Sequence, residues 1–495
     1  MFAMRRAGAR SLAAGKLHAR NLGSAVSEAK LSEVERKLED GNVDTVIVGF
    51  TDLYGRLMGK RYNKSDFLAN VVRSGAHSCG YLFCVDVPMN PLPGFKFASW
   101  EAGYGDCHLV PDLDSLTVCA WNKGTAIVQC DVHATDSHEL VPIAPRSILR
   151  NQLKRLESLT FNEGKSSAEQ IGVVNAASEL EHYLFEDSYR EAHEKGYAGV
   201  KPAGYYSEDY HILQGYRTEP FHREVRRMLE KSGVPVENSK GETGIGQHEV
   251  NVRFDEMLRM ADRHMIFKQA MKEIAESQGR SVTFMAKPFD TDAGSSCHIH
   301  CSVFNNEGSN LFYGDDTLDS IEKCSPIFKS FLAGWIEHTP ELFALYAPTV
   351  NSYKRFQSGS WAPTATAWGK DNRTAGFRVV GSGQALRIEC RLPGADVNVY
   401  LAFAAAIASG LDGIERGLQP PPILEGDGYK AASDAVRKPP ATLGEAARAF
   451  AKSDFVRNTF GAEVQEHYAH FYALEQQAYD QAVTDWERKR YFEQI

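Results

Sequence analysis

The chain contains 495 residues, and its 55 Lys and Arg against 64 Asp and Glu give a formal charge of −9. Apolar residues make up 43% of it and charged residues 24%, an ordinary globular composition that disfavours disorder, collagen and coiled-coil arrays. A mildly acidic chain is a poor candidate for binding nucleic-acid phosphates, and no apolar run approaches the ~18 residues that a membrane span needs, so neither partner is expected.

The first 27 residues differ in composition from the rest. They carry five basic residues and no acid before Glu28. A basic, acid-free segment with Ala and Ser is typical of an organellar presequence, although a disordered basic tail or an over-long start assignment gives the same composition. We therefore treat residues 1–29 as a tail or presequence. The protein is expected to be mitochondrial if the segment is a presequence and cytoplasmic otherwise.

The next stretch is rich in predicted strands. A short helix is expected over 31–40, and β-type runs cover 45–50, 81–87, 117–121 and 125–131. Prolines and a glycine between positions 88 and 94 indicate a loop. Residues 30–140 are therefore predicted to form a small β-rich domain.

From residue 141 to 495 the pattern changes to strands separated by longer helices, an α+β body. Helices are expected over 144–157, 254–279, 326–338, 400–411 and, in several pieces, 443–491. Ser325 is placed to cap the third of these, and Pro340 is expected just past its end.

Nine cysteines without a Cys-x-x-Cys pair indicate reduced thiols rather than a secreted disulfide framework. Seven of them are expected as small core residues, at positions 79, 84, 107, 119, 130, 324 and 390.

Two pairs of glutamates are the first candidates for metal ligands. Glu179 and Glu181 are separated by one residue inside an apolar run, so on a strand both carboxylates project from one face. Two buried like charges need a neutralising cation, whereas a solvated edge strand would need none. Glu242 and Glu249 form a second pair, among glycines that allow a ligand to approach the backbone.

Two histidines and several arginines extend this pattern. His298 and His300 share a strand face, while Cys297 and Cys301 point to the opposite face, which disfavours zinc. Carboxylates and imidazole without thiolate select Mg²⁺ or Mn²⁺.

A third strand alternates Arg387, Glu389 and Arg391 with apolar residues, and Arg355, Arg373 and Arg378 lie upstream. The arginines predict either surface salt bridges or a cradle for phosphate and carboxylate. No Gly-x-x-x-x-Gly-Lys-Ser/Thr loop occurs, so metals and arginines would have to hold any nucleotide phosphates.

Taken together, these motifs resemble the type I glutamine synthetase family over nearly all of residues 30–495. The resemblance is carried by segments 51–56, 179–181, 246–249, 284–288, 294–300, 351–355, 372–373 and 387–391, in the family's order and spacing. It implies an N-terminal β-grasp domain, a catalytic domain built on an antiparallel half-barrel sheet, and a double-ring homo-oligomer, typically a dodecamer. It also implies two or three Mg²⁺ or Mn²⁺ ions per site.

The resemblance further implies a role for each motif residue. Glu181, Glu242 and Glu249 would hold one metal, and Glu179, His298 and Glu389 another. Gly294, Arg355 and Arg391 would bind glutamate, while Arg373 and Arg378 would meet the transferred phosphoryl group. His300, Ser302 and Arg387 would contact ATP.

The sequence departs from the ammonia-using members at the position of their flap glutamate, which is Trp361 here. Their acidic ammonium residue has no clear match either, the nearest stretch being 75–79, and no adenylylation loop is recognisable around Tyr429. The Gly-Ser-aromatic-Ala-Pro pattern resembles the γ-glutamylpolyamine and γ-glutamylmonoamine synthetase branch, where Trp361 would face the amine.

The sequence therefore predicts an ATP-dependent ligase that joins glutamate to a primary amine through γ-glutamyl phosphate. Glutamine synthetase proper, using ammonia, is the nearest alternative. A catalytically inactive structural or regulatory homologue is the alternative from another class, although such a protein has no need of an intact set of metal ligands and arginines.

Overall fold

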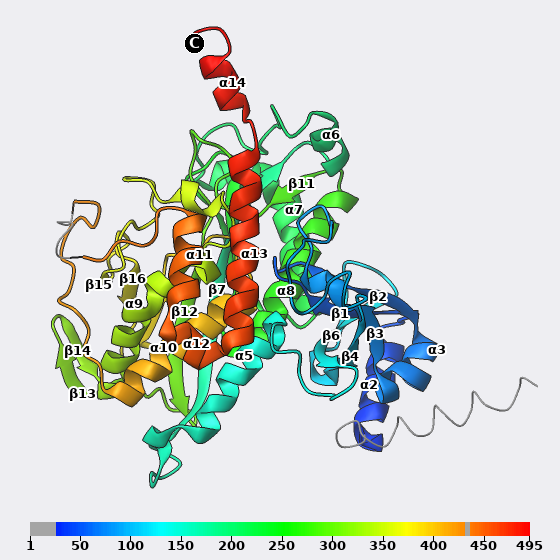
Figure 1. Cartoon of the computed structure of the whole chain (residues 1–495), viewed down its shortest axis with the longest axis horizontal. Helices are drawn as coiled ribbons and strands as arrows, with labels where there is room; N and C mark the ends of the chain where they lie inside the picture. Colours follow the sequence, from blue (N-terminus) through cyan, green and yellow to red (C-terminus); the bar gives the residue numbers. More distant parts are fainter. Residues whose placement is uncertain (1–25, 431–435) are drawn as a thin grey trace, which may run out of the picture.

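The computed structural model describes residues 26–430 and 436–495. The described chain forms two large sheets and one two-stranded sheet, flanked by helices (Figure 1). This confirms the predicted α+β class. Most of the predicted N-terminal tail, residues 1–25, lies outside the described residues.

The N-terminal unit is a six-stranded sheet in the order β2-β1-β6-β4-β3, with β5 paired to β6. Its strands are β1 (Thr45–Thr51), β2 (Leu57–Asn63), β3 (Ala76–Cys79), β4 (Asp106–Pro111), β5 (Thr117–Val118) and β6 (Thr125–Ala134). The central pair β1 and β6 is parallel, and the other pairs are antiparallel. Helix α2 (Glu28–Asp40) buries Leu31, Val34 and Leu38, and Ser27 caps its start. The short helices α3 (Lys64–Asp66) and α4 (Val72–Ser74) follow β2.

One strand predicted in this unit is wrong. Residues 81–87 do not form a strand; Gly80–Phe83 form a single 3₁₀ turn, and only Val85 makes an isolated bridge, to Pro91. Phe83, Cys84 and Val85 are consecutive and all buried, whereas a strand with one solvated face exposes every second residue. The prolines that follow also lack the N–H groups that a ladder needs.

The second sheet has nine strands in the order β15-β16-β17-β12-β7-β9-β8, with β10 and β11 also paired to β7. All its pairs are antiparallel except β15 with β16. The strands are β7 (Ile171–Phe185), β8 (Val236–Gly241), β9 (Gln247–Val252), β10 (Asp255–Glu256), β11 (Ser281–Thr283), β12 (Cys297–Asn305), β15 (Trp368–Lys370), β16 (Phe377–Val380) and β17 (Arg387–Cys390). A separate hairpin joins β13 (Tyr313–Leu318) to β14 (Ile321–Cys324).

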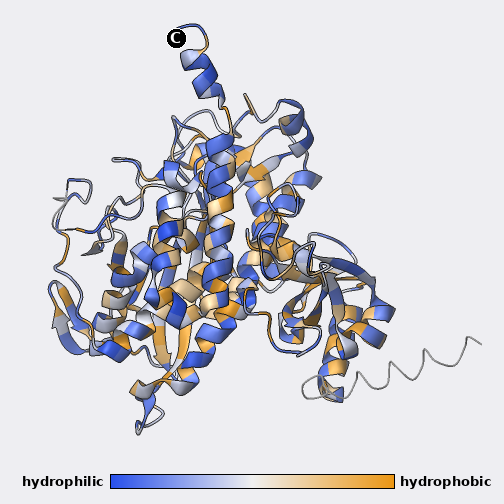
Figure 2. Ribbon diagram, viewed as in Figure 1, coloured by the Kyte–Doolittle hydropathy of each residue, from blue (hydrophilic) through white to orange (hydrophobic). Residues whose placement is uncertain are grey.

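Helices cover this sheet and bury its apolar face, so that hydrophobic segments concentrate on the strands and inner helices (Figure 2). The helices are α5 (Pro145–Lys154), α6 (Tyr189–Glu194), α7 (Ile212–Lys231), α8 (Met257–Ser277), α9 (Pro326–Tyr346), α10 (Val399–Arg416), α11 (Leu443–Lys452), α12 (Asp454–Phe460), α13 (Ala462–Gln481) and α14 (Asp485–Tyr491). In the described part of the chain, no helix combines the length and apolar character needed to cross a bilayer.

Helix α9 corrects a second prediction. Ser325 caps its start as predicted, accepting a hydrogen bond from the Phe328 N–H at 3.1 Å, but the helix continues through Pro340 to Tyr346. A proline inside a helix costs about 3 kcal/mol. Dense packing offsets that cost, because α9 is buried along most of its length and lies against α10.

All nine cysteines are free, and eight are buried. Cys79 is exposed, contrary to the prediction of a core position, because β3 lies at the edge of its sheet and Cys79 faces outward.

A buried ion-pair cluster joins the N-terminal sheet to the rest of the molecule. Arg146, in α5, donates two hydrogen bonds to Asp262 of α8, at 3.0 and 2.8 Å, and one to Asp112, at 2.7 Å. It also pairs with Asp131 of β6. One guanidinium group therefore links the N-terminal sheet to helices α5 and α8.

Candidate active site

The predicted site residues converge on one cavity of about 590 Å³ above the nine-stranded sheet. Eleven of the fifteen line it: Glu179, Glu181, Glu242, Glu249, Gly294, His298, Arg355, Trp361, Arg373, Arg378 and Arg391. Strand register explains the convergence. Glu179 pairs directly with His298 across β7 and β12, and Glu181 pairs with Glu249 across β7 and β9. Directly paired residues of antiparallel strands share a face, so all four side chains project into the cavity.

One wall of the cavity is acidic. Burial and the neighbouring Glu242 raise the pKa of Glu181 to about 7. Burial, with Glu179 and Glu242, raises the pKa of Glu249 well above its usual value. These carboxylates repel one another without a positive charge between them, and Lys240, which contacts Glu242, is the one cation on this wall among the described residues. A divalent cation would relieve the repulsion.

A second ligand group adjoins the first. His298 Nδ1 lies 3.3 Å from Glu179 Oε2 and 3.6 Å from Glu389 Oε1. One donor atom from each of these three residues lies within 4.8 Å of the others, as is also true of Glu181, Glu249 and His298. Burial and the neighbouring Arg391 lower the pKa of His298 to about 4, so its imidazole is neutral and able to bind a metal.

The donor set of these two groups is suited to a hard divalent ion. It contains carboxylate oxygens and one imidazole, which Mg²⁺ and Mn²⁺ accept. Cys297 and Cys301 are buried on the opposite face of β12 and cannot contribute thiolate. The residues present thus fit the metals that the family resemblance implies.

The opposite wall is cationic. Arg378 Nη1 donates to Glu389 Oε2 at 2.8 Å, and Arg391 Nη1 donates to Glu389 Oε1 at 2.5 Å, so one carboxylate fixes both guanidinium groups. Burial opposes ionisation of Glu389, but His300, His298 and Arg391 outweigh it and lower its pKa to about 2. Arg355 is buried and donates to the carbonyls of Leu392 and Arg391 at 2.8 and 2.9 Å. A substrate anion would meet preorganised positive charge here.

Gly294 lies at the junction of the two walls. A Cβ at this position would lie 2.7 Å from the Ala286 carbonyl oxygen and 2.7 Å from Arg355 Cγ, so only glycine lets the chain pass beside Arg355.

The three predicted ATP contacts lie in a neighbouring hollow of about 290 Å³. His300, Ser302 and Arg387 line it, and it shares Glu179 and Asn251 with the larger cavity. Arg387 Nε donates to His300 Nδ1 at 3.2 Å, and His300 Nε2 lies 3.0 Å from Glu179 Oε1. The exposed ring of Phe254 also lines this hollow and offers a face on which a base could stack. The structure thus places the predicted nucleotide contacts beside the predicted metal ligands.

Trp361 lies at the rim of the larger cavity. It is 57% exposed, with φ at +62°, in a tight loop that the Ser360 hydroxyl holds by donating to the Arg355 carbonyl at 2.9 Å. The indole therefore forms an apolar wall that a ligand can reach from solvent.

Several residues that support the site were not singled out from the sequence. Gln247 Nε2 donates to Glu181 at 3.1 Å, and the Ser296 hydroxyl donates to the same carboxylate at 2.6 Å. Both lie inside motifs that did contain predicted ligands, so their position was a usable signal. Lys240 and Asp209 also line the cavity, but nothing in the surrounding sequence indicated them.

Comparison with known proteins gives consistent results. A family profile described as glutamine synthetase, catalytic domain, matches residues 142–491. The chain is 42% identical over 465 residues to the γ-glutamylethanolamide synthetase of Streptomyces coelicolor, covering 94% of this chain and 96% of that protein. It is 34% identical over 470 residues to the glutamate–isopropylamine ligase of a Pseudomonas species, covering 95% of this chain and 99% of that protein. Among solved structures, the complex of GmaS with ADP is similar, with a TM-score of 0.79 and 28% identity, covering 93% of this chain and 99% of that one.

Proposed function

The chain belongs to the glutamine synthetase family, and on that premise we propose that it is an ATP-dependent ligase that joins the γ-carboxyl group of glutamate to a primary amine. The observation that carries the proposal is one cavity with an acidic wall, an arginine wall and an exposed indole at its rim. One relative is named for a γ-glutamylethanolamide product and another for isopropylamine as the substrate that it ligates, which supports an amine rather than ammonia as the nucleophile.

Two metal sites follow from the acidic wall. Glu181, Glu242 and Glu249 would hold one ion, and Glu179, His298 and Glu389 another. The metal would be Mg²⁺ or Mn²⁺, with two or three ions in the whole active site. When bound, these ions would neutralise phosphate oxygens of ATP as charge shifts during transfer.

The arginine wall would allow two anions to meet. Arg355 and Arg391, with the backbone at Gly294, would hold glutamate, while Arg373 and Arg378 would lie beside the transferred phosphoryl group. His300, Ser302 and Arg387 would hold the nucleotide in the adjoining hollow. Fixed guanidinium groups lower the electrostatic barrier between a carboxylate and a triphosphate without having to reorganise.

The reaction takes place in two steps, phosphoryl transfer and then amide formation. A γ-carboxylate oxygen of glutamate forms a bond to the γ-phosphorus of ATP, and ADP leaves with the electron pair of the broken bond. The amine nitrogen then forms a bond to the carbonyl carbon of γ-glutamyl phosphate, inorganic phosphate leaves, and the nitrogen loses a proton. The indole of Trp361 would contact the alkyl part of the amine, a contact that ammonia cannot make.

A coupled ADP-release assay tests this function. The full chain, with glutamate, ATP and Mg²⁺, is given ammonia, isopropylamine, ethanolamine or putrescine, and the product is identified by mass spectrometry. We expect a lower KM for at least one primary amine than for ammonia, with a γ-glutamyl amide as product. Best activity with ammonia would make the protein a glutamine synthetase, and no ADP release with any nucleophile would make it an inactive homologue.

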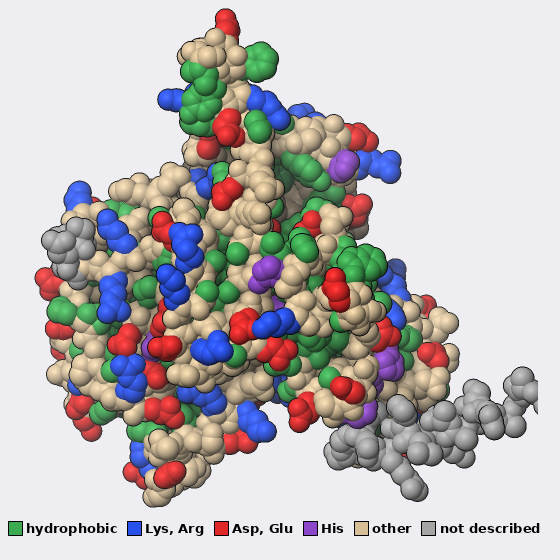
Figure 3. All heavy atoms as spheres, in the orientation of Figure 1, with side chains coloured by type: hydrophobic (Ala, Val, Ile, Leu, Met, Phe, Trp, Pro, Cys, Tyr) green, Lys and Arg blue, Asp and Glu red, His purple; other side chains and the backbone are tan. Residues whose placement is uncertain are grey.

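Assembly and location belong to the same proposal. A double-ring homo-oligomer follows from the family resemblance. Trp486 of α14 and Phe492 just after it are exposed and available for contacts between subunits. Figure 3 shows hydrophobic side chains on this projecting C-terminal end. Mass photometry of the purified protein tests the oligomer. A mitochondrial location depends on cleavage near residues 21–28. Intact-mass analysis of the native protein tests this, and an N-terminus at Met1 in a cytosolic fraction would contradict it.

A further inference from the structure

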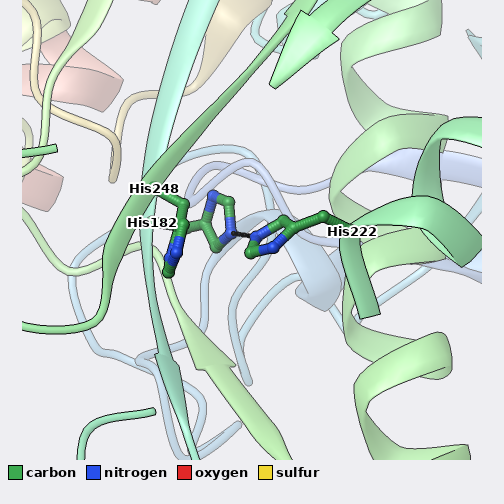
Figure 4. A group of neighbouring side chains, drawn as sticks. All are labelled: His182, His222 and His248. Carbon is green, nitrogen blue, oxygen red and sulfur yellow. Dashed lines mark hydrogen bonds between the residues drawn. The ribbon is translucent and has the colours of Figure 1, made fainter. Parts of the chain in front are cut away.

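Three buried histidines meet behind the active site, on the face of the sheet that the reaction does not use. His182 of β7 pairs directly with His248 of β9, one position along from the Glu181–Glu249 pair. Alternation along the strands therefore sends the two glutamates into the cavity and the two imidazoles to the opposite face. There α7 covers the sheet and contributes His222 (Figure 4). All three side chains are buried.

The spacing of the three rings suits a metal ion. His182 Nε2 lies 3.2 Å from His222 Nε2, and the rings of His222 and His248 have centroids 4.3 Å apart. One ring nitrogen from each histidine lies within 4.8 Å of the others. Two nitrogens that each bind tetrahedral zinc at about 2.0–2.1 Å are about 3.3 Å apart. The closest pair already has this separation.

The residues around the three rings also suit a bound cation. His182 and His222 are buried between the sheet and α7. The other ring nitrogen of His182, Nδ1, is buried without a hydrogen-bond partner in the described structure, so the polar contact of this ring is with His222 through Nε2. Glu208 Oε2 lies 3.0 Å from His248 Nε2, which also contacts the Thr218 hydroxyl at 3.1 Å. The cluster therefore has a carboxylate beside it that can offset part of a dication's charge.

The space that the Glu208 side chain occupies depends on two neighbouring glycines. A Cβ at Gly241 would lie 2.2 Å from Glu208 Cδ, and a Cβ at Gly215 would lie 2.6 Å from Glu208 Oε1. Two glycines thus leave the space that this carboxylate occupies.

We propose that His182, His222 and His248 bind one divalent transition-metal ion of the zinc class, with the Glu208 carboxylate beside His248 to offset part of its charge. The donors distinguish this site from the carboxylate-rich cavity, because three imidazoles favour zinc-class ions over Mg²⁺. The ion would fix α7 to β7 and β9 directly behind Glu181 and Glu249. It would also anchor the segment before α7, whose Asp209 lines the active-site cavity.

Cobalt titration of the full chain tests the site. The protein carries no histidine tag, is freed of metal by a chelator, and is titrated with Co²⁺ under excess Mg²⁺, which occupies the carboxylate sites. We expect the visible absorption of tetrahedral Co²⁺ to saturate at one ion per chain and to be lost on adding Zn²⁺.

Single variants test whether the cobalt absorption comes from the three histidines. His222→Leu should abolish the cobalt absorption, whereas His193→Leu, a change at an exposed histidine of α6, should leave it intact. Glu249→Gln should also leave it intact, because that residue faces the other side of the sheet. His182→Phe provides a second removal of one ligand if His222→Leu fails to fold.

Three results would overturn the proposal: no tetrahedral absorption in the wild type, an unchanged signal in a folded His222→Leu or His182→Phe protein, or loss of the signal in Glu249→Gln. None of these readouts depends on ligase activity, so failure of the zinc-class site and failure of the proposed function can be distinguished.

Discussion

Replacing Trp361 by Ala should weaken the binding of alkylamines while leaving ammonia almost unaffected. Trp361 is 57% exposed at the rim of the cavity. Its φ of +62° makes the choice of replacement important. Alanine also carries a Cβ, so the backbone strain stays similar and the change reports on the missing indole.

The size of the effect follows from the exposed surface. A tryptophan side chain of about 200 Å² that is 57% exposed offers roughly 110 Å² to a ligand. An alkylamine that covers about half of this surface removes ~55 Å² from water, which is worth about 1.4 kcal/mol at 25 cal/mol/Å². We therefore expect KM for isopropylamine to rise about tenfold in Trp361→Ala.

Steady-state ADP release with varied amine measures this effect, and two controls accompany it. Trp361→Phe retains an aromatic wall and should change KM for isopropylamine by about threefold at most. Ammonia has no alkyl group to contact the wall, so its KM should stay within about twofold of the wild-type value. Equal changes for ammonia and isopropylamine, or no change for either, would refute the placement of the amine against this residue.

Three further predictions concern the metal ligands, the ion-pair cluster around Arg146 and the pH dependence of stability. Glu249→Gln should abolish Mg²⁺-dependent ADP release with an unchanged circular dichroism spectrum, because it removes a metal ligand and no packing group; normal ADP release would contradict the assignment. Arg146→Met should lower the free energy of unfolding by about 3–5 kcal/mol, since it leaves the buried Asp262 without its guanidinium partner, while Asp112 and Asp131 keep Arg150. The more exposed Arg150→Met should cost about 1 kcal/mol or less; equal losses in denaturant titrations would count against a buried network. Burial opposes the charging of His338, but hydrogen bonds to Asp412 and Glu341 outweigh it and raise its pKa. The stabilisation is therefore fully present below about pH 6.5 and is lost as pH rises through the raised folded-state pKa. The stability gap between wild type and His338→Gln should be on the order of 2 kcal/mol near pH 6 and should narrow as pH rises; a constant gap would exclude this origin.

Local sequence rules placed the candidate ligands on the strand faces that the structure shows, because a strand period of two is visible in a short segment. Glu179 with Glu181, and His298 with His300, could each be assigned to one face without knowing which strands pair. Which strands pair was not accessible in this way. Register between β7, β9 and β12, segments far apart in the chain, decides that the two pairs face one cavity.

The errors arose where tertiary packing outweighs a local preference. The proline at 340 marks a helix end by local chemistry, yet burial of α9 against α10 carries the helix six residues further. Residues 81–87 have strand composition but bury consecutive side chains. The histidine cluster gave no local signal at all, because His182, His222 and His248 come from three elements and each resembles a single core histidine.

The same register that assembles the candidate active site also assembles the histidine cluster. Glu181 opposite Glu249 and His182 opposite His248 are neighbouring rungs of one ladder, and they face opposite sides of the sheet. A slip of one residue between β7 and β9 would turn the imidazoles of one strand toward the cavity and bury its carboxylates against α7. Buried carboxylates without a cation are costly, so the acidic wall alone disfavours the slip. An ion held by the histidines would oppose the same slip from the other face, because it could bind only in the native register. Binding on the unused face would thus stabilise the geometry of the face that is proposed to catalyse the reaction, without touching a substrate.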